Sequence, residues 1–131
     1  MIVVDTSALL AILNGEPERD QFLDILAHDD GPMISAVTLY ETMLVLRARR
    51  GPDNLDDLAE MLETAEAQIV PFDEPQARAA SAAYARFGKG IHSTARLNLC
   101  DCVAYALAAD LRVPLLFKGS DFQATDVIAA S

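Results

Sequence analysis

Four carboxylic acids, far apart in the chain, each stand beside a segment that the sequence predicts as a strand or as the start of a helix. Asp5 directly follows the apolar run at residues 2–4, and Asp121 comes shortly after another apolar run. Glu41 and Asp101 lie early in two predicted helices. A lone Asp after a strand is most often a helix cap, so these acids indicate chemistry only if the fold brings them together.

Asp101 lies in the stretch LNLCDCVAYALAADL, residues 97–111, which otherwise has the composition of a buried helix. At helical spacing it shares a face with Ala104, Tyr105 and Ala108. A carboxylate that leaves water must be paired or must bind a metal ion, because burying a bare charge is costly. Asp101 is therefore the acid that is hardest to explain as an ordinary surface residue.

The two cysteines that flank this acid, Cys100 and Cys102, could instead suggest a thiol site. Successive helical residues are about 100° apart, so these two side chains point to nearly opposite sides of the helix. They are poorly placed to hold one metal ion or to form a disulfide with each other, and the sequence contains no other cysteine. We expect two buried or half-buried thiols in a reducing compartment.

Apolar runs and helical patterns alternate along the chain, which indicates an α/β fold. The runs expected to form strands cover residues 2–4, 33–35, 68–72 and 113–117, with a short one at 127–128. The first expected helix is capped by Thr6 or Ser7 and ends at Leu13, and the second runs from Pro17 to the break at Asp30-Gly31-Pro32. The third runs from residue 36 or 37 to Arg50 and is ended by Gly51-Pro52, and the fourth is capped by Asp53 or Asn54 and ends near residue 65. The last two run from Glu74 to about residue 87 and within residues 97–111.

This alternation predicts a parallel sheet with helices on both faces, in a single domain that covers residues 1–131. In such sheets ligands bind at the carboxyl ends of the strands, and the crossover helices begin at that same edge. The two acids that follow strands, Asp5 and Asp121, should therefore point to this edge. The two acids near helix starts, Glu41 and Asp101, should point to it as well, which predicts an acidic cleft.

An acidic cleft of this kind suits a metal ion. Four carboxylates repel each other and raise each other's pKa unless a cation is present. Mg²⁺ and Mn²⁺ prefer all-oxygen sites, and an ion shared with a substrate phosphate is suited to phosphodiester hydrolysis. Asp126 is a candidate fifth acid. Hydroxyl groups near the acids could orient a carboxylate or hold a water, with helix capping as the alternative role, and these are Thr6, Ser7, Thr38 and Ser120.

The overall charge limits the kind of nucleic-acid binding that the chain can perform. Asp and Glu total 20 and Lys and Arg total 10, which gives a net charge of −10. Nonspecific coating of nucleic acid relies on phosphate neutralisation and is disfavoured, whereas a nuclease with an acidic metal site is not. The cations that could steer an RNA backbone are Arg86, Lys89 and Arg96, together with the group Arg47, Arg49 and Arg50.

The sequence shows neither the pattern of a membrane span nor that of a signal peptide. No apolar run reaches the roughly 18 residues of a membrane span. The first residues lack the basic region of a signal peptide, and Asp5 interrupts their apolar run. We therefore expect a cytoplasmic protein without membrane contact.

Four pieces of the sequence together resemble a known family. They are MIVVDTSAL, ISAVTLYE, LNLCDCVAYALA and LLFKGSDFQATDV, and they are similar to the PIN-domain ribonucleases, in particular the VapC toxins of bacterial type II toxin–antitoxin pairs. The resemblance implies a three-layer α/β/α sandwich with a mainly parallel sheet. It also implies Mg²⁺ or Mn²⁺ binding, endonucleolytic cleavage of RNA to 5′-phosphate and 3′-hydroxyl ends, a homodimer, and inhibition by a small antitoxin.

Carried over to this sequence, the acidic quartet of the family matches Asp5, Glu41, Asp101 and Asp121. The hypothesis is that Asp5, Asp101 and Asp121 ligate one or two metal ions, with Glu41 as a further ligand or as the base toward a water. An antitoxin arginine inserted between these carboxylates would exclude both metal and RNA, since guanidinium pairs bidentately with carboxylates. Two positions depart from the family pattern, with Cys100 in place of the usual glycine and Ser93 in place of a frequent proline.

Two alternatives remain open from the sequence. A phosphohydrolase of the haloacid-dehalogenase type also has an Asp after its first strand, but it needs a second Asp two residues later, where this chain has Ser7. The other alternative is a PIN-like module with impaired catalysis that binds RNA or a protein, for which Cys100 is the only support.

Overall fold

The structure, a computed structural model, describes residues 1–50 and 54–131 of the chain. The expected breaker Gly51-Pro52 and the expected cap Asp53 lie outside the described residues. In chain order the elements are β1 (Val3–Val4), α1 (Thr6–Leu13), α2 (Arg19–Ala27), β2 (Met33–Ser35), α3 (Ala36–Arg50), α4 (Asn54–Thr64), β3 (Gln68–Val70), α5 (Glu74–Phe87), α6 (Leu99–Leu111) and β4 (Leu115–Leu116).

The four strands pair in parallel in the order β3-β2-β1-β4. Val3 in β1 is opposite both Met33 in β2 and Leu115 in β4. The chain therefore starts inside the sheet, adds strands on one side, and then crosses to add β4 on the other side. Ligand sites in open α/β sheets lie where the order of strands reverses in this way. Asp5 follows β1 and Asp121 follows β4, the two strands at this reversal.

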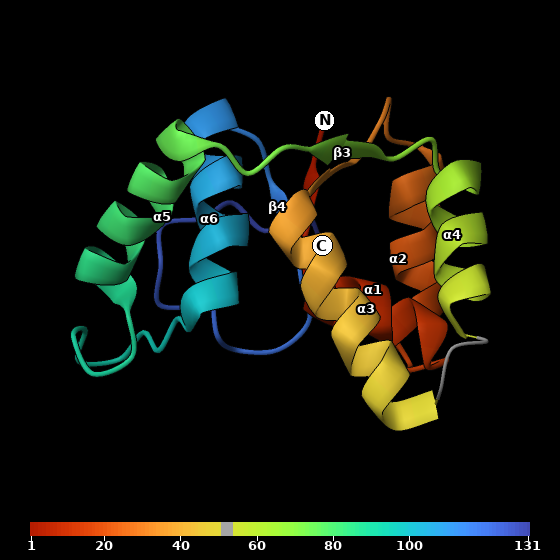
Figure 1. Ribbon diagram of the computed structural model, residues 1–131, viewed down its shortest axis with the longest axis horizontal. Helices are drawn as coiled ribbons and strands as arrows, with labels where there is room; N and C mark the ends of the chain where they lie inside the picture. Colours follow the sequence, from red (N-terminus) through yellow and green to blue (C-terminus); the bar gives the residue numbers. More distant parts are fainter. Residues whose placement is uncertain (51–53) are drawn as a thin grey trace.

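Alternate strand residues divide the core into two layers, as the pleat of a strand requires. Val3, Met33 and Leu115 pack with α5 and α6 in one apolar cluster. The next residue of each strand, Val4, Ile34 or Leu116, packs with α1 and α2 in the other cluster. Figure 1 shows α5 and α6 on one side of the strands and α1, α2 and α4 on the other. The predicted α/β fold with a parallel sheet between helices is confirmed.

The ends of the helices differ in part from the sequence prediction. Asp5, and not Thr6 or Ser7, caps α1, because its Oδ2 accepts the backbone N–H of Ser7 at 3.0 Å. Helix α2 begins at Arg19, two residues after the expected Pro17. The predicted extents of α3, α5 and α6 agree with the structure to within two residues.

The strands are shorter than the apolar runs predicted. β3 ends at Val70, directly before Pro71, which has no N–H to continue the ladder. β4 covers only Leu115–Leu116, because its partner β1 is equally short. The expected tail strand is reduced to a single bridge between Leu115 and Ala129. Among the described residues, the helices are all too short or too polar to cross a membrane.

Candidate active site

Asp5 is a buried carboxylate at the carboxyl end of β1, with only 3% of its surface exposed. Its Oδ2 accepts hydrogen bonds from the hydroxyl of Ser7 at 2.6 Å and from the Ser7 backbone N–H at 3.0 Å. Burial raises the pKa of Asp5 above its ordinary value, the two Ser7 hydrogen bonds oppose this, and the Glu41 carboxylate adds to it. A buried carboxylate with a raised pKa is poised to gain from a nearby cation.

Asp101 lies in the first turn of α6 and is 9% exposed. It forms a capping box with Asn98, whose side chain accepts the Asp101 N–H at 2.8 Å, while Oδ2 of Asp101 accepts the Asn98 N–H at 3.1 Å. Burial raises the pKa of Asp101 to about 7 against the Asn98 hydrogen bond, with smaller increases from the carboxylates of Asp5, Asp121 and Glu41. The position of Asp101 at a helix start explains how an apolar helix accommodates it.

Asp5, Glu41, Asp101 and Asp121 lie near enough for the charges of the other three to raise the pKa of Asp101. Glu41 is half-buried on α3, whose start is joined to α1 by three threonines. The Thr42 hydroxyl donates to the Thr38 carbonyl at 2.8 Å, and its oxygen lies 3.2 Å from the Thr6 hydroxyl. These contacts fix the helix that carries Glu41 against the helix that Asp5 caps. Thr42 was not among the predicted hydroxyls, although its spacing of four residues from Thr38 places both on one helix face.

Asp121 is the exposed member of the quartet and lies in a turn after β4. The backbone N–H of Lys118 donates to the Ser7 hydroxyl at 3.0 Å, which joins the segment after β4 to the start of α1. Ser7 therefore contacts Asp5 and the Asp121 segment at once. Ser120 is exposed beside Asp121. Of the four expected hydroxyls, that of Ser7 donates to an acid of the quartet among the described contacts, whereas the Thr6 hydroxyl donates to the Thr38 backbone carbonyl at 3.3 Å.

The acidic quartet has no partner cation among the described residues. The nearby Lys118 instead pairs with Glu16 and Glu18. Nor do three His, Cys, Asp or Glu side chains within residues 1–50 and 54–131 already converge as metal ligands. Like charges repel each other, so these carboxylates gain from a bound cation. The hydrogen bonds from Ser7 to Asp5 and from Asn98 to Asp101 both end on Oδ2. An all-oxygen set of side chains is the kind that a hard divalent ion prefers.

Two other predicted site residues lie in a separate cluster. Asp126 accepts a hydrogen bond from the Tyr105 hydroxyl and pairs with Arg86 at 3.3 Å. The Tyr105 hydrogen bond, helped by Arg86, lowers the pKa of Asp126 below its ordinary value. The structure therefore does not bring Asp126 to the other acids, and it engages Arg86 within the protein.

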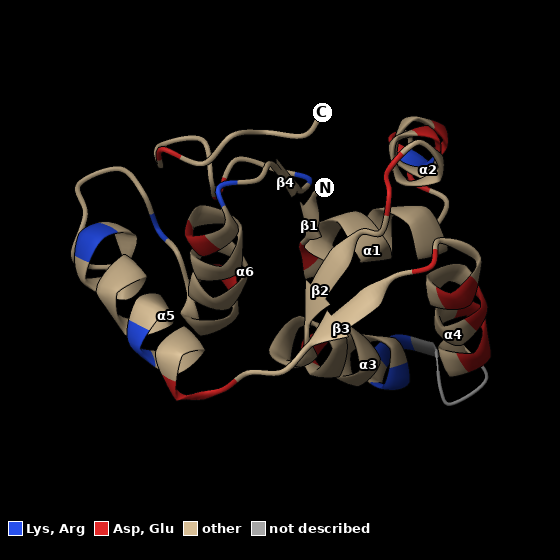
Figure 2. Cartoon of the chain, turned by 90° about the horizontal axis from the view of Figure 1, so that it is seen from above, with Lys and Arg blue, Asp and Glu red and all other residues tan. Residues whose placement is uncertain are grey.

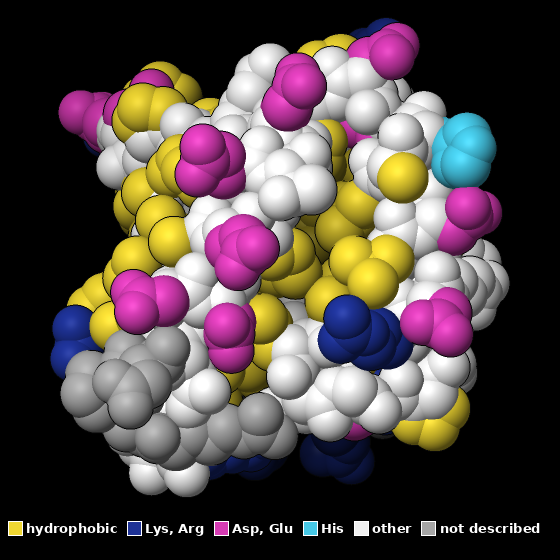
Figure 3. All heavy atoms as spheres, turned by 90° about the vertical axis from the view of Figure 1, so that its right-hand side faces the viewer, with side chains coloured by type: hydrophobic (Ala, Val, Ile, Leu, Met, Phe, Trp, Pro, Cys, Tyr) yellow, Lys and Arg dark blue, Asp and Glu magenta, His cyan; other side chains and the backbone are white. Residues whose placement is uncertain are grey.

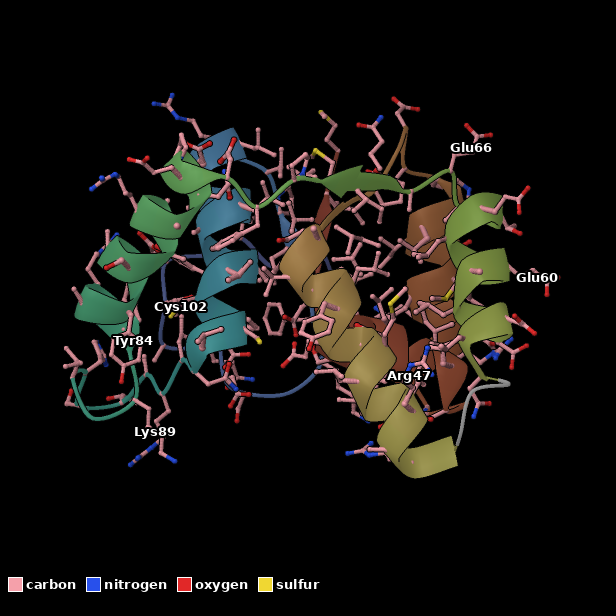
Figure 4. The ribbon with its side chains drawn as sticks, in the orientation of Figure 1. Arg47, Glu60, Glu66, Tyr84, Lys89 and Cys102 are labelled. Atoms are coloured by element: carbon pink, nitrogen blue, oxygen red, sulfur yellow. The ribbon has the colours of Figure 1, made fainter. Side chains whose placement is uncertain are left out.

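Four further residues predicted to bind RNA are exposed, namely Arg47, Arg49, Lys89 and Arg96. Lys89 and Arg96 both lie in the loop between α5 and α6, whose ends are joined where the Lys89 N–H donates to the Leu97 carbonyl at 3.0 Å. His92 stabilises the loop, since its Nδ1 accepts the N–H groups of two following residues at 3.0 and 2.8 Å. Figure 4 shows Lys89 at the lower left, below the start of α6, and Arg47 farther to the right, on α3.

Both cysteines are free, as predicted. Burial raises the pKa of the Cys100 thiol to about 12, with a further increase from the neighbouring Glu41 carboxylate. Burial likewise raises the pKa of Cys102 to about 11. Because the thiolate is the form that binds metal, these raised pKa values disfavour a thiol ligand in the metal-free protein.

Two apolar hollows lie away from the acids. One, of about 620 Å³, is formed by α1, α2 and α4, with Asp57 and Glu60 among its lining residues. In Figure 3 it is the apolar hollow between acidic side chains. The other, of about 700 Å³, lies between α3, α5 and α6 and has Lys89 as its charged residue. Neither is lined by a member of the quartet, so the acids do not share an enclosed pocket with either hollow.

The fold and the acidic edge agree with comparisons to known proteins. The sequence profile of the PIN domain matches residues 2–128. The chain is 46% identical over 126 residues to ribonuclease VapC28 of Mycobacterium tuberculosis, covering 96% of this chain and 95% of that protein. The chain therefore belongs to the PIN-domain family, in its VapC ribonuclease group, and this membership favours the nuclease hypothesis over a phosphohydrolase of the haloacid-dehalogenase type.

Solved structures share the fold at lower sequence identity. The crystal structure of Mycobacterium tuberculosis VapC20, described as a toxin that cleaves the sarcin-ricin loop, has a TM-score of 0.79 at 19% identity and covers 98% of this chain and 97% of that one. A toxin–antitoxin complex from Klebsiella pneumoniae has a TM-score of 0.72 at 20% identity, over 100% and 98% of the two chains. At these identities the likeness concerns the fold alone.

Proposed function

We propose that the protein is an endoribonuclease, the toxin of a toxin–antitoxin pair, and that residues 1–131 form one nuclease domain that uses Mg²⁺ or Mn²⁺ in the cytoplasm. The observation that carries the proposal is that four carboxylates, two of them buried, lie near enough for their charges to interact and have no partner cation among the described residues. Membership in the VapC ribonuclease group supports RNA as the substrate.

Asp5, Asp101 and Asp121 would hold the metal ion, with Glu41 as a further ligand or as the base that takes a proton from the attacking water. When bound, a divalent ion stabilises charge on the scissile phosphate and makes a water more acidic. The protein's own contribution is to place the acids. Ser7 orients Asp5 through the hydroxyl, and Asn98 orients Asp101 through the capping box.

The charge distribution supports an RNA path toward the acids. Figure 2 shows acidic segments concentrated on α4 and basic segments near the end of α3 and in the loop that joins α5 to α6. We propose that exposed Lys89 and Arg96 contact the RNA backbone, together with Arg47. Arg86 is a weaker candidate for this role because Asp126 and Tyr105 already occupy its guanidinium.

The partner of the toxin would be a small antitoxin of the VapB kind, and the toxin itself would act as a homodimer. A guanidinium from the antitoxin could pair with the uncompensated carboxylates in place of the metal ion. Support comes from the acidic quartet and from the shared fold of the Klebsiella toxin–antitoxin complex.

The test is cleavage of defined RNA by the purified protein in the presence of Mg²⁺ or Mn²⁺. Asp5→Asn and Asp101→Asn should each lower cleavage by more than about 100-fold, because loss of a metal ligand exceeds the effect of a supporting residue. Asp110→Asn is the matched control, since Asp110 is an exposed acid near the other end of α6. Full activity of Asp101→Asn, or equal loss in Asp110→Asn, would contradict the proposal.

A further inference from the structure

The segment that carries Asp121 has little regular structure of its own. After β4 it forms turns, and apart from the bridge at Ala129 it belongs to no helix or strand. A side chain on an irregular segment is only as well placed as the contacts that hold that segment. The anchors on either side of Asp121 therefore decide where this exposed acid lies.

The first anchors stand before and directly after Asp121. The Lys118 N–H donates to the Ser7 hydroxyl at 3.0 Å, which fixes the start of the segment. Phe122 is buried, and its ring centroid lies 5.0 Å from that of Phe117. These contacts hold the near side of the turn, and separate contacts hold the chain after Phe122.

On the far side, backbone bonds tie the chain to β4 from Ile128 onward, and Asp126 provides the side-chain anchor between these bonds and Asp121. The hydroxyl of Tyr105, on α6, donates to Oδ1 of Asp126. The guanidinium of Arg86, on α5, lies 3.3 Å from Oδ2 and 3.5 Å from the Tyr105 hydroxyl. Arg86 is in turn held over the Phe87 ring, 4.6 Å from its centroid, and the Phe87 and Tyr105 rings meet edge to face at 5.4 Å. Two helices thus hold one carboxylate of the segment.

The two partners of Asp126 are not equal. The side chains of Arg86 and Asp126 are 59% and 62% exposed, so water and salt screen their ion pair. Tyr105 is only 4% exposed, and its ring is packed in the core. The hydroxyl of a fixed ring loses little freedom when it donates to a carboxylate, so Tyr105 is the main anchor and Arg86 the weaker one.

Tyr105 follows Asp101 by one helical turn on α6. One rigid helix therefore carries one acid of the quartet and also the anchor of the segment that carries another. We infer that Tyr105, assisted by Arg86, is a positioning residue that acts through Asp126 to hold the Asp121 segment against α6 and so sets the separation between Asp101 and Asp121. This inference rests on the proposed function, because that separation matters only if the two acids act together.

The inference gives Asp126 a role different from that of a fifth metal ligand. As a positioning residue, Asp126 needs only an oxygen that accepts the Tyr105 hydrogen bond, which an amide also supplies. Asp126→Asn should therefore keep most of the Mn²⁺ affinity, whereas Asp126→Ala should lose about tenfold or more. If Asp126 were a direct ligand, the amide would fail nearly as badly as alanine.

The main test is Tyr105→Phe, which removes the hydroxyl and keeps the ring packing against Phe87. Binding of Mn²⁺ alone, measured by calorimetry, should weaken by about tenfold. Backbone hydrogen exchange over residues 118–126 should become faster, while exchange in α6 stays unchanged. Arg86→Met should give a smaller change in the same direction. Arg78→Met is the matched control, because Arg78 forms an ion pair with Glu74 on the same helix, away from this segment.

Three results would overturn the inference. The first is wild-type Mn²⁺ affinity together with unchanged hydrogen exchange in Tyr105→Phe. The second is an equal loss of Mn²⁺ affinity in Asp126→Asn and Asp126→Ala. The third is an effect of Arg78→Met on Mn²⁺ affinity as large as that of Arg86→Met. The exchange measurement needs no metal ion. It therefore tests the anchor even if the wild-type protein binds no Mn²⁺, a result that would instead overturn the proposed metal-dependent function.

Discussion

Asp101 and Asp126 lie near the same helix, yet their electrostatic surroundings are opposite. Burial, with three neighbouring carboxylates, raises the pKa of Asp101 to about 7. Asp126 is exposed, and the Tyr105 hydroxyl and Arg86 lower its pKa. A carboxylate with hydrogen-bond and ion-pair partners stabilises the fold. A buried carboxylate beside other carboxylates destabilises the fold unless a cation is bound. The surroundings of each acid, more than the residue type, therefore separate a site from a structural contact.

The largest expected effect is that of a metal ion on the site around Asp101. Mn²⁺ at about a hundred times its dissociation constant should raise the free energy of unfolding by about 2.7 kcal/mol, because only the folded chain gathers the acids. Urea denaturation with and without Mn²⁺ measures this increase. Asp101→Asn should abolish the increase and Arg78→Met should retain it, so an increase that survives in Asp101→Asn would place the metal ion elsewhere.

In the metal-free protein, Asp101→Asn and Asp126→Ala should differ in their effect on the free energy of unfolding. Near neutral pH and above, Asp101→Asn should unfold at the same or a higher urea concentration than the wild type. The variant removes a buried charge and keeps an oxygen for the capping box. Asp126→Ala should unfold at a lower concentration, because it leaves the Tyr105 hydroxyl without its acceptor. If urea denaturation shows that Asp101→Asn is less stable than Asp126→Ala, this prediction is wrong.

The pH dependence of the metal-free protein should show the same contrast. The folded state binds the Asp101 proton more tightly than the unfolded state, since its pKa rises from 3.8 to about 7. The contribution of Asp101 to stability is therefore fully present below the unfolded value and is lost as the pH rises through about 7. Asp126, whose pKa is lowered, contributes above 3.8 and loses this contribution as the pH falls below it. Denaturation across this range should give a flatter profile for Asp101→Asn, and an unchanged profile would contradict the assignment.

The smallest expected effect concerns the cap of α6. Asn98→Ala should lower the free energy of unfolding by about 1 kcal/mol, the usual loss for a side-chain helix cap. The Asn98 backbone N–H remains in the variant, so its hydrogen bond to Asp101 is kept. Urea denaturation at constant pH measures the loss, and Asn14→Ala at the end of α1 serves as a comparison, because its recorded contacts there are backbone bonds. A loss several times larger would mean that the capping box also holds the acid site together.

Much of the acid site could be predicted because each acid is marked by local sequence. Asp5 follows an apolar run, and Asp101 interrupts an apolar helix. The alternation of strands and helices then places such residues at one edge of the sheet. The strand order could not be predicted, because pairing between β1 and β4 joins segments more than a hundred residues apart without any local signal.

The incorrect or missing details depend on contacts made far away in the chain. Asp5, Thr6 and Ser7 are all good helix caps, and only tertiary contacts decide between them. The hydroxyl of Thr6 faces Thr38, and that of Ser7 donates to Asp5. Similarly, an exposed arginine on a helix has the same local pattern whether it meets RNA or, as Arg86 does, an acid forty residues later in the chain.

The capping box also affects which inactivating mutations a cell can tolerate. Asp121 lies in an exposed turn, and its replacement removes a carboxylate without exposing a helix end. Replacement of Asp101 by most residues would also leave the Asn98 N–H at the start of α6 without its acceptor. In cells that survive because the nuclease is inactivated but still folded, we expect varied replacements at Asp121. At Asp101 we expect mainly asparagine, the change that keeps the helix start intact.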